Sequence, residues 1–177
     1  MLELARNAIK SEFDGAPLKI SPAKLDPLLI AKGSVFVTLT ENEQLRGCIG
    51  HLSAIKELYK DIIENAVSAA FDDPRFEPLA PSELDRIKIE ISILSAPHEL
   101  EYKDSTDLLE KLTPLKDGVI LSKGFNKATY LPQVWEDLKD KESFLSSLCI
   151  KAGLDPLSWK NEHLKIELYG AEKFEED

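Results

Sequence analysis

The sequence predicts an α+β fold in which an antiparallel or mixed β-sheet is flanked by helices. Residues 87–94 alternate isoleucine with polar side chains, as a half-buried strand does. Residues 33–52 place two apolar runs around the polar segment 41–44, which is typical of an antiparallel hairpin. Residues 55–71 repeat apolar side chains every three or four positions, which predicts a helix with one buried face.

The other elements follow from the same patterns and from residues that break them. Further helices are expected over residues 2–13, 105–112, 132–139 and 142–152, and further strands over the hairpin 118–132 and over 163–176. Ser53 is expected to cap the helix over 55–71, and Gly153 to end the helix over 142–152. These two helices are expected to pack on the sheet.

The composition limits the class of protein. The chain of 177 residues suits one domain, 1–177, with two sub-lobes whose boundary the sequence does not fix. Its net charge is -10 and its basic residues do not cluster, which argues against nucleic-acid binding. No apolar run approaches the roughly 18 residues that cross a bilayer, and the first 13 residues are amphipathic, unlike a signal peptide. We therefore expect a cytoplasmic protein with no membrane contact.

The cysteines and histidines match no familiar cofactor pattern. Cys48 and Cys149 form neither a disulfide framework nor a CxxC pair, and the three histidines are too widely spaced for a zinc pattern. A glycine-rich phosphate loop is also missing from the sequence. The sequence therefore predicts no metal and no cofactor. Cys149 lies among apolar side chains of a predicted helix, where packing is its expected role.

The segment "LRGCIGHL", residues 45–52, is the first candidate for a site. In an extended strand Arg46 and Cys48 share one face, and a guanidinium beside a thiol lowers the thiol pKa. Gly47 and Gly50 leave room for a ligand or another backbone. Leu45 and Ile49, on the other face, are expected to contact the core.

A purely structural interpretation of this segment stays open. Free cysteine is often a small buried hydrophobe, so Cys48 could simply pack, and Arg46 could form a structural ion pair. His51 lies opposite Cys48 and is a poor base for it unless a bulge at Gly50 reverses the alternation.

Two further segments are candidates. In "DDPRFEPL", residues 72–79, Asp72, Asp73 and Arg75 could form a polar network while a buried Phe76 anchors the loop, or the segment could be a rigid connector. In "TYLPQVW", Tyr130 or Gln133 could line a cleft, or both could pack.

Together these segments resemble the AMMECR domain family. The resemblance covers nearly the whole chain and is carried by "FVTL", "LRGCIG", "NAVSAAFDDPRFEPL", "IEISILS", "GVILSKG", "YLPQVW" and "FLSSLCIKAGL", in that order. Glu77 stands where the family commonly has proline. The resemblance implies a two-lobed α+β protein with the hexapeptide near a cleft. Prokaryotic members include protein A of AmmeMemoRadiSam systems, so Memo-type and radical SAM proteins are implied as partners.

Two functional hypotheses remain. In the first, a cleft around "RGCIG" binds a small anionic or peptide ligand through Arg46, Gly47, Gly50, Asp73, Arg75 and Gln133. In the second, the chain is an enzyme or enzyme component with Cys48 as the nucleophile and Arg46 as its activator, oriented by Asp72 or Asp73. The second hypothesis lacks a general base, because no catalytic triad can be assigned.

Overall fold

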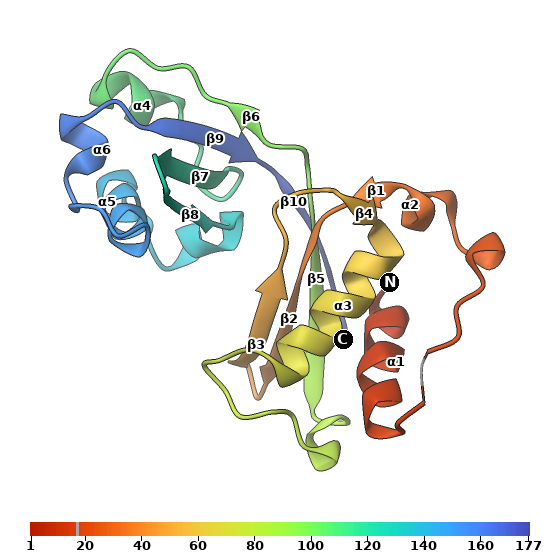
Figure 1. Ribbon diagram of the computed structural model, residues 1–177. Coiled ribbons are helices and arrows are strands. Elements are labelled where there is room, and N and C mark those ends of the chain that lie inside the picture. The colour runs from red at the N-terminus through yellow and green to blue at the C-terminus, as the bar shows by residue number, and fades with distance from the viewer. Residues whose placement is uncertain (17) are drawn as a thin grey trace. The chain divides into compact units, whose positions relative to one another are not determined.

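The computed structural model describes residues 1–16 and 18–177, and its fold is the predicted α+β class (Figure 1). The chain forms two compact units. The first comprises Met1–Leu94 together with Glu172–Asp177, and the second comprises Ser95–Ala171. Each unit has its own four-stranded sheet and its own hydrophobic core, so the single sheet expected from the sequence is in fact divided in two.

The first unit is built on a sheet with strand order β10-β5-β2-β3. Its strands are β2 (Val35–Glu41), β3 (Gln44–Gly50), β5 (Ile87–Leu94) and β10 (Ala171–Glu175). β2 pairs antiparallel with both β3 and β5, which confirms the first hairpin and the strand over 87–94. Asn42 and Glu43 take positive φ at the hairpin turn, as two-residue turns between strands require.

Two helices cover one face of this sheet. Figure 1 shows α1 (Leu2–Phe13) and α3 (Leu58–Phe71) side by side against it. Their apolar faces meet the isoleucines of β5 and the valines of β2 in one core. The C-terminal segment returns to this unit, where Glu176 accepts a hydrogen bond from Arg6 Nε at 2.8 Å.

The helix expected over 55–71 begins later than predicted. Lys56 and Glu57 form the short strand β4, which pairs with β1 (Lys32–Gly33), so α3 starts at Leu58. Ser53 is therefore not its cap, and Ile55 is 69% exposed instead of buried. Pairing with β1 has overridden the helical periodicity of these first residues. The first unit also holds η1 (Pro22–Lys24), α2 (Pro27–Ile30) and η2 (Pro81–Glu83).

A bulge in the first hairpin corrects the predicted faces of β3. Leu39 pairs with Gly47 and Thr40 with Leu45, so Arg46 is an extra residue in the strand. Leu45 thereby moves off the face that Gly47 occupies and is 44% exposed, whereas Ile49 packs partly against the core. The prediction that Leu45 contacts the core was wrong for this reason.

The second unit has the strand order β6-β9-β7-β8. Its elements are β6 (His98–Glu99), α4 (Ser105–Lys111), β7 (Gly118–Lys123), β8 (Asn126–Tyr130), η3 (Pro132–Glu136), α5 (Lys141–Lys151), α6 (Ser158–Asn161) and β9 (Lys165–Tyr169). Its core includes Trp135 stacked on Phe144, with ring centroids 3.6 Å apart. Cys149 is fully buried in this core, which agrees with its predicted packing role. Gly153 takes a φ of +75° just after α5, as expected of the residue that ends this helix. In the described parts of the chain, no helix has both the length and the apolar character needed to cross a bilayer.

Candidate functional site

The edge of β3 is covered by the side chains of the following loop. β3 is the last strand in its sheet, so the backbone groups of Cys48 that point outward have no strand partner. Asp73 Oδ2 accepts a hydrogen bond from the Cys48 N–H at 2.8 Å, and Arg75 Nη2 donates to the Cys48 carbonyl at 3.3 Å. This loop therefore satisfies an exposed strand edge that would otherwise invite pairing with another chain.

Asp73 and Arg75 also bind each other. Arg75 Nε and Nη2 donate to the two carboxylate oxygens of Asp73 at 2.9 and 2.7 Å, and the Asp73 side chain is only 2% exposed. The Arg75 guanidinium, with the backbone N–H of Cys48 in support, holds the pKa of Asp73 well below its usual range. Of the polar network predicted for this loop, Asp73 and Arg75 are joined to each other and to the hexapeptide, whereas Asp72 lies outside it and accepts from Ser68.

Arg46 is held by a different acid from the ones predicted. Its Nε and Nη2 donate to the two carboxylate oxygens of Glu83 at 2.7 and 3.2 Å. Neither Asp72 nor Asp73 orients it, because Asp72 accepts from Ser68 Oγ and Asp73 binds Arg75. Arg46 therefore forms the ion pair that the structural interpretation of the motif expected.

Phe76 lies close to both guanidinium groups. The Cζ atoms of Arg46 and Arg75 are 5.9 and 5.5 Å from the centre of its ring, within the range of cation–π attraction. The ring is only partly buried, so the prediction of a buried Phe76 was wrong. The loop is instead anchored by Leu79, which is 3% exposed and whose N–H donates to the Ala70 carbonyl at 2.8 Å.

The Cys48 thiol is not activated in the way that the sequence predicted. Burial raises its pKa, and the nearby Arg75 offsets only part of that effect. Thr38 Oγ1, directly across the hairpin, donates to Sγ at 3.3 Å. Arg46, which the sequence predicted as the activator, is bound to Glu83 and is not among the groups that lower the thiol pKa.

Both glycines of the hexapeptide face protein atoms. A Cβ on Gly47 would lie 2.1 Å from the carbonyl oxygen of Ala69 in α3. A Cβ on Gly50 would lie 2.3 Å from the Phe36 ring and 2.5 Å from the Val35 carbonyl oxygen. Close packing of β3 against α3 and β2 is therefore sufficient reason for both glycines.

The residues of "TYLPQVW" belong to the second unit. Tyr130 packs edge-on against Phe144, and its hydroxyl lies 2.8 Å from Ser147 Oγ, in keeping with a packing role. Gln133 lies in η3 but is not among the residues that line the nearby hollow of about 410 Å³, which include Trp135 and Glu136. Ligand binding by Gln133 stays a prediction. Among the residues described, no cluster of three or more His, Cys, Asp or Glu is suited to a metal ion.

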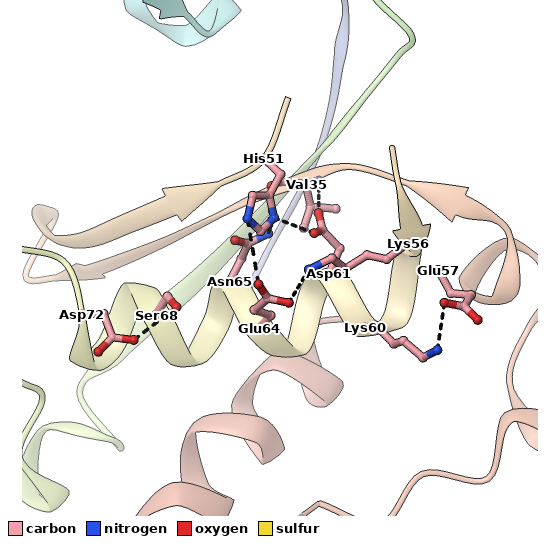
Figure 2. A network of polar contacts seen from close by, with 10 residues as sticks. All are labelled: Val35, His51, Lys56, Glu57, Lys60, Asp61, Glu64, Asn65, Ser68 and Asp72. Carbon is pink, nitrogen blue, oxygen red and sulfur yellow. Dashed lines mark hydrogen bonds and ion pairs between the residues drawn. The ribbon is translucent and has the colours of Figure 1, made fainter. Parts of the chain in front are cut away.

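Sequence reasoning missed a polar cluster at the end of β3. Figure 2 shows His51 above α3 and joined to Asp61. His51 Nδ1 lies 2.7 Å from Asp61 Oδ1. Asp61 Oδ2 accepts from the Val35 N–H at 2.9 Å, and Asn65 Nδ2 lies 3.2 Å from His51 Nδ1. Asp61 and Asn65 are four residues apart on the buried face of α3, and that spacing of polar residues on an apolar face was the available signal.

Comparison with known proteins places the chain in a family. The AMMECR1 family model matches residues 2–174. The chain belongs to the AMMECR1 family. A similar protein, LS215_2104 of Saccharolobus islandicus, is 40% identical over 175 residues, which cover 96% of this chain and 77% of that protein. A Methanothermobacter thermautotrophicus protein is 36% identical over 178 residues, covering all of this AMMECR1 chain and 93% of its own length.

A solved structure supports the fold. The crystal structure of the uncharacterized protein PH0010 from Pyrococcus horikoshii matches with a TM-score of 0.91 and 37% sequence identity. The match covers 99% of this chain and 89% of that one. The hexapeptide resemblance therefore identified the AMMECR1 family and the α+β fold correctly, and the biochemical role has to be argued from the site.

Proposed function

We propose that this protein is a binding module and that its binding surface consists of Arg46, Phe76 and Arg75. This three-residue set is called the Phe76 surface below. The observation that carries the proposal is that two guanidinium groups lie within 6 Å of the centre of the partly exposed ring. Arg46 binds Glu83, and Arg75 binds Asp73, in each case through Nε and Nη2. The Nη1 atom of each arginine has no hydrogen-bond partner in the described part of the chain.

The surface is suited to a peptide more than to a small anion. Arg46 is paired with Glu83 and Arg75 with Asp73, so these four side chains contribute no net charge. A bare anion would gain little from such pairs, whereas carbonyl oxygens can accept from the remaining N–H groups and an apolar side chain can rest on the ring. Gly47 and Gly50 support this surface indirectly by letting β3 pack closely against α3 and β2.

The enzyme hypothesis is the weaker alternative. A cysteine nucleophile requires a thiolate, and burial raises the pKa of Cys48. His51, the nearest histidine in sequence, is hydrogen-bonded to Asp61 on α3, whereas the thiol accepts from Thr38. Partnership with Memo-type and radical SAM proteins stays a prediction of the family resemblance, and a peptide segment of such a partner would fit the proposed ligand class.

Chemical-shift mapping tests the proposal. A pool of N-acetylated, C-amidated tetrapeptides would be titrated into ¹⁵N-labelled protein, with sodium acetate as the anionic comparison. We expect the largest shifts at the Arg75 and Arg46 side-chain N–H groups and at the Cys48 amide. Shifts confined to other parts of the chain, or a stronger response to acetate than to peptides, would contradict it.

A further inference from the structure

Asp61 is a buried carboxylate that joins three elements. Its side chain is 1% exposed, and its two oxygens bind the start of β2 through the Val35 N–H and the end of β3 through His51. A buried carboxylate is tolerated only when its oxygens are hydrogen-bonded. The position of the imidazole is therefore fixed by a rigid acceptor on the helix.

The short contact fixes the position of the imidazole proton. His51 Nδ1 lies 2.7 Å from Asp61 Oδ1, and an ionised carboxylate can only accept hydrogen bonds. The proton must therefore be on Nδ1, and in the neutral ring the lone pair is then on Nε2. Asn65 Nδ2 does not need the Nδ1 lone pair, because the Val35 carbonyl lies 3.3 Å from it.

His51 is partly exposed. Its side chain is 40% exposed, and its outer nitrogen Nε2 lies 4.0 Å from Glu64, which is beyond hydrogen-bonding distance. Glu64 is held in turn by Lys56 (Figure 2). Asn65 Oδ1 is buried and has no hydrogen-bond partner in the described part of the chain, so the cluster retains an unused acceptor for a water molecule or a hydroxyl group.

We propose that His51 is a general base whose Nε2 takes a proton from water or from a hydroxyl group of a bound ligand. In this step the O–H bond breaks, the proton forms an N–H bond at Nε2, and the electron pair stays on the oxygen. The carboxylate of Asp61 stabilises the resulting imidazolium and acts as a positioning residue. The same arrangement of buried acid and exposed imidazole underlies proton transfer in unrelated hydrolases. The proposal does not depend on the Phe76 surface.

The tautomer gives a test that needs no substrate. ¹⁵N spectra of histidine-labelled protein report which ring nitrogen carries the proton. They would be recorded at a pH at which the imidazole is neutral. We expect the proton on Nδ1 in His51 and on Nε2 in the exposed His98, since free imidazole side chains favour the latter. A proton on Nε2 of His51 would overturn the proposal, and this measurement on the unmodified chain stands even if a variant fails to fold.

Reactivity gives the second test. Diethyl pyrocarbonate acylates unprotonated imidazole, and mass spectrometry can follow His51, His98 and His163 in one sample. His51 should react faster than the other two, and Asp61→Asn should slow it by roughly tenfold or more, because it removes a hydrogen bond to a charged group. Glu64→Gln removes a charge from the same helix without touching Nδ1 and should have a smaller effect. Equal effects of the two variants, or His51 reacting no faster than His98, would contradict the proposal.

Discussion

The backbone N–H of Cys48 donates to the buried carboxylate of Asp73 at 2.8 Å, across 25 residues of sequence. This contact connects the hexapeptide to the loop that follows α3. Arg75 completes it by binding both Asp73 and the Cys48 carbonyl. The two sequence segments that stood out separately thus form one structural unit, on which the Phe76 surface is built.

Asp73 should make stability dependent on acidic pH. Its pKa in the folded protein is lowered, whereas an aspartate in an unfolded chain has a pKa of about 3.9. The contribution is therefore complete above the unfolded value and is lost as the pH falls below about 4 toward the lower folded pKa. Asp73→Ala should lower the free energy of unfolding by roughly 1.5–3 kcal/mol at pH 7, the range for hydrogen bonds to charged groups. Urea unfolding at pH 7 and pH 3 checks this, and a variant deficit that is as large at pH 3 as at pH 7 would contradict it.

Substitution of Gly47 by alanine should be strongly destabilising. The added Cβ would overlap the Ala69 carbonyl oxygen, a backbone atom that cannot move without displacing α3. We expect a loss of roughly 1–3 kcal/mol or more, as for other overpacked sites. Gly170→Ala is the matched control, since its Cβ would meet only Ser95 Oγ at 3.7 Å. If the two variants had similar thermal unfolding midpoints, the need for a glycine at position 47 would lie in room for a ligand and not in close packing against α3.

Phe76 and Leu79 should differ in what they stabilise. Leu79→Ala empties a buried site and should cost roughly 2–5 kcal/mol in denaturant unfolding. Phe76→Ala removes a partly exposed ring and two cation–π contacts, each worth about 0.5–1 kcal/mol at exposed sites, so its cost should be smaller. A larger loss for Phe76→Ala than for Leu79→Ala would show that the ring is the anchor after all.

The two thiols should label slowly at neutral pH and in a fixed order. Burial raises the pKa of both Cys48 and Cys149, so the rate of iodoacetamide labelling should still rise above about pH 8.5, where an unperturbed thiol is half ionised. Cys48 is only partly buried and should react before the fully buried Cys149. If the pH profile of the labelling rate gave Cys48 an apparent pKa below about 8.5, the nucleophile hypothesis would be restored.

Local pattern was sufficient for most of the fold. The alternation in 87–94, the hairpin around Asn42 and the helix over 2–13 depend on neighbours within a few residues, and all three are present. The bulge at Arg46 was not predictable, because it depends on how β2 and β3 pair. The start of α3 was also misjudged, since residues 56–57 pair with a strand more than 20 positions earlier.

The site was predictable only in part, for the same physical reason. The sequence pointed to Arg46, Cys48, Asp73 and Arg75, but it could not show which acid holds which arginine. Glu83, the partner of Arg46, lies 37 residues away in η2. Arg46 is thus bound to Glu83 and lies beside Phe76, and burial raises the pKa of Cys48 where the sequence predicted a lowered one.

Peptide binding at the Phe76 surface can be measured directly. The most direct measurement is the dissociation constant of the tightest-binding member of the capped peptide pool, obtained by fluorescence anisotropy for the unmodified chain and for Arg75→Gln, Arg46→Gln and Arg86→Gln. Arg86 pairs with Glu41 on the surface and contacts no aromatic ring in the described residues, so it is the control. We predict that the first two variants weaken binding roughly tenfold and that Arg86→Gln does not. Equal affinities for all four proteins would contradict the proposed function.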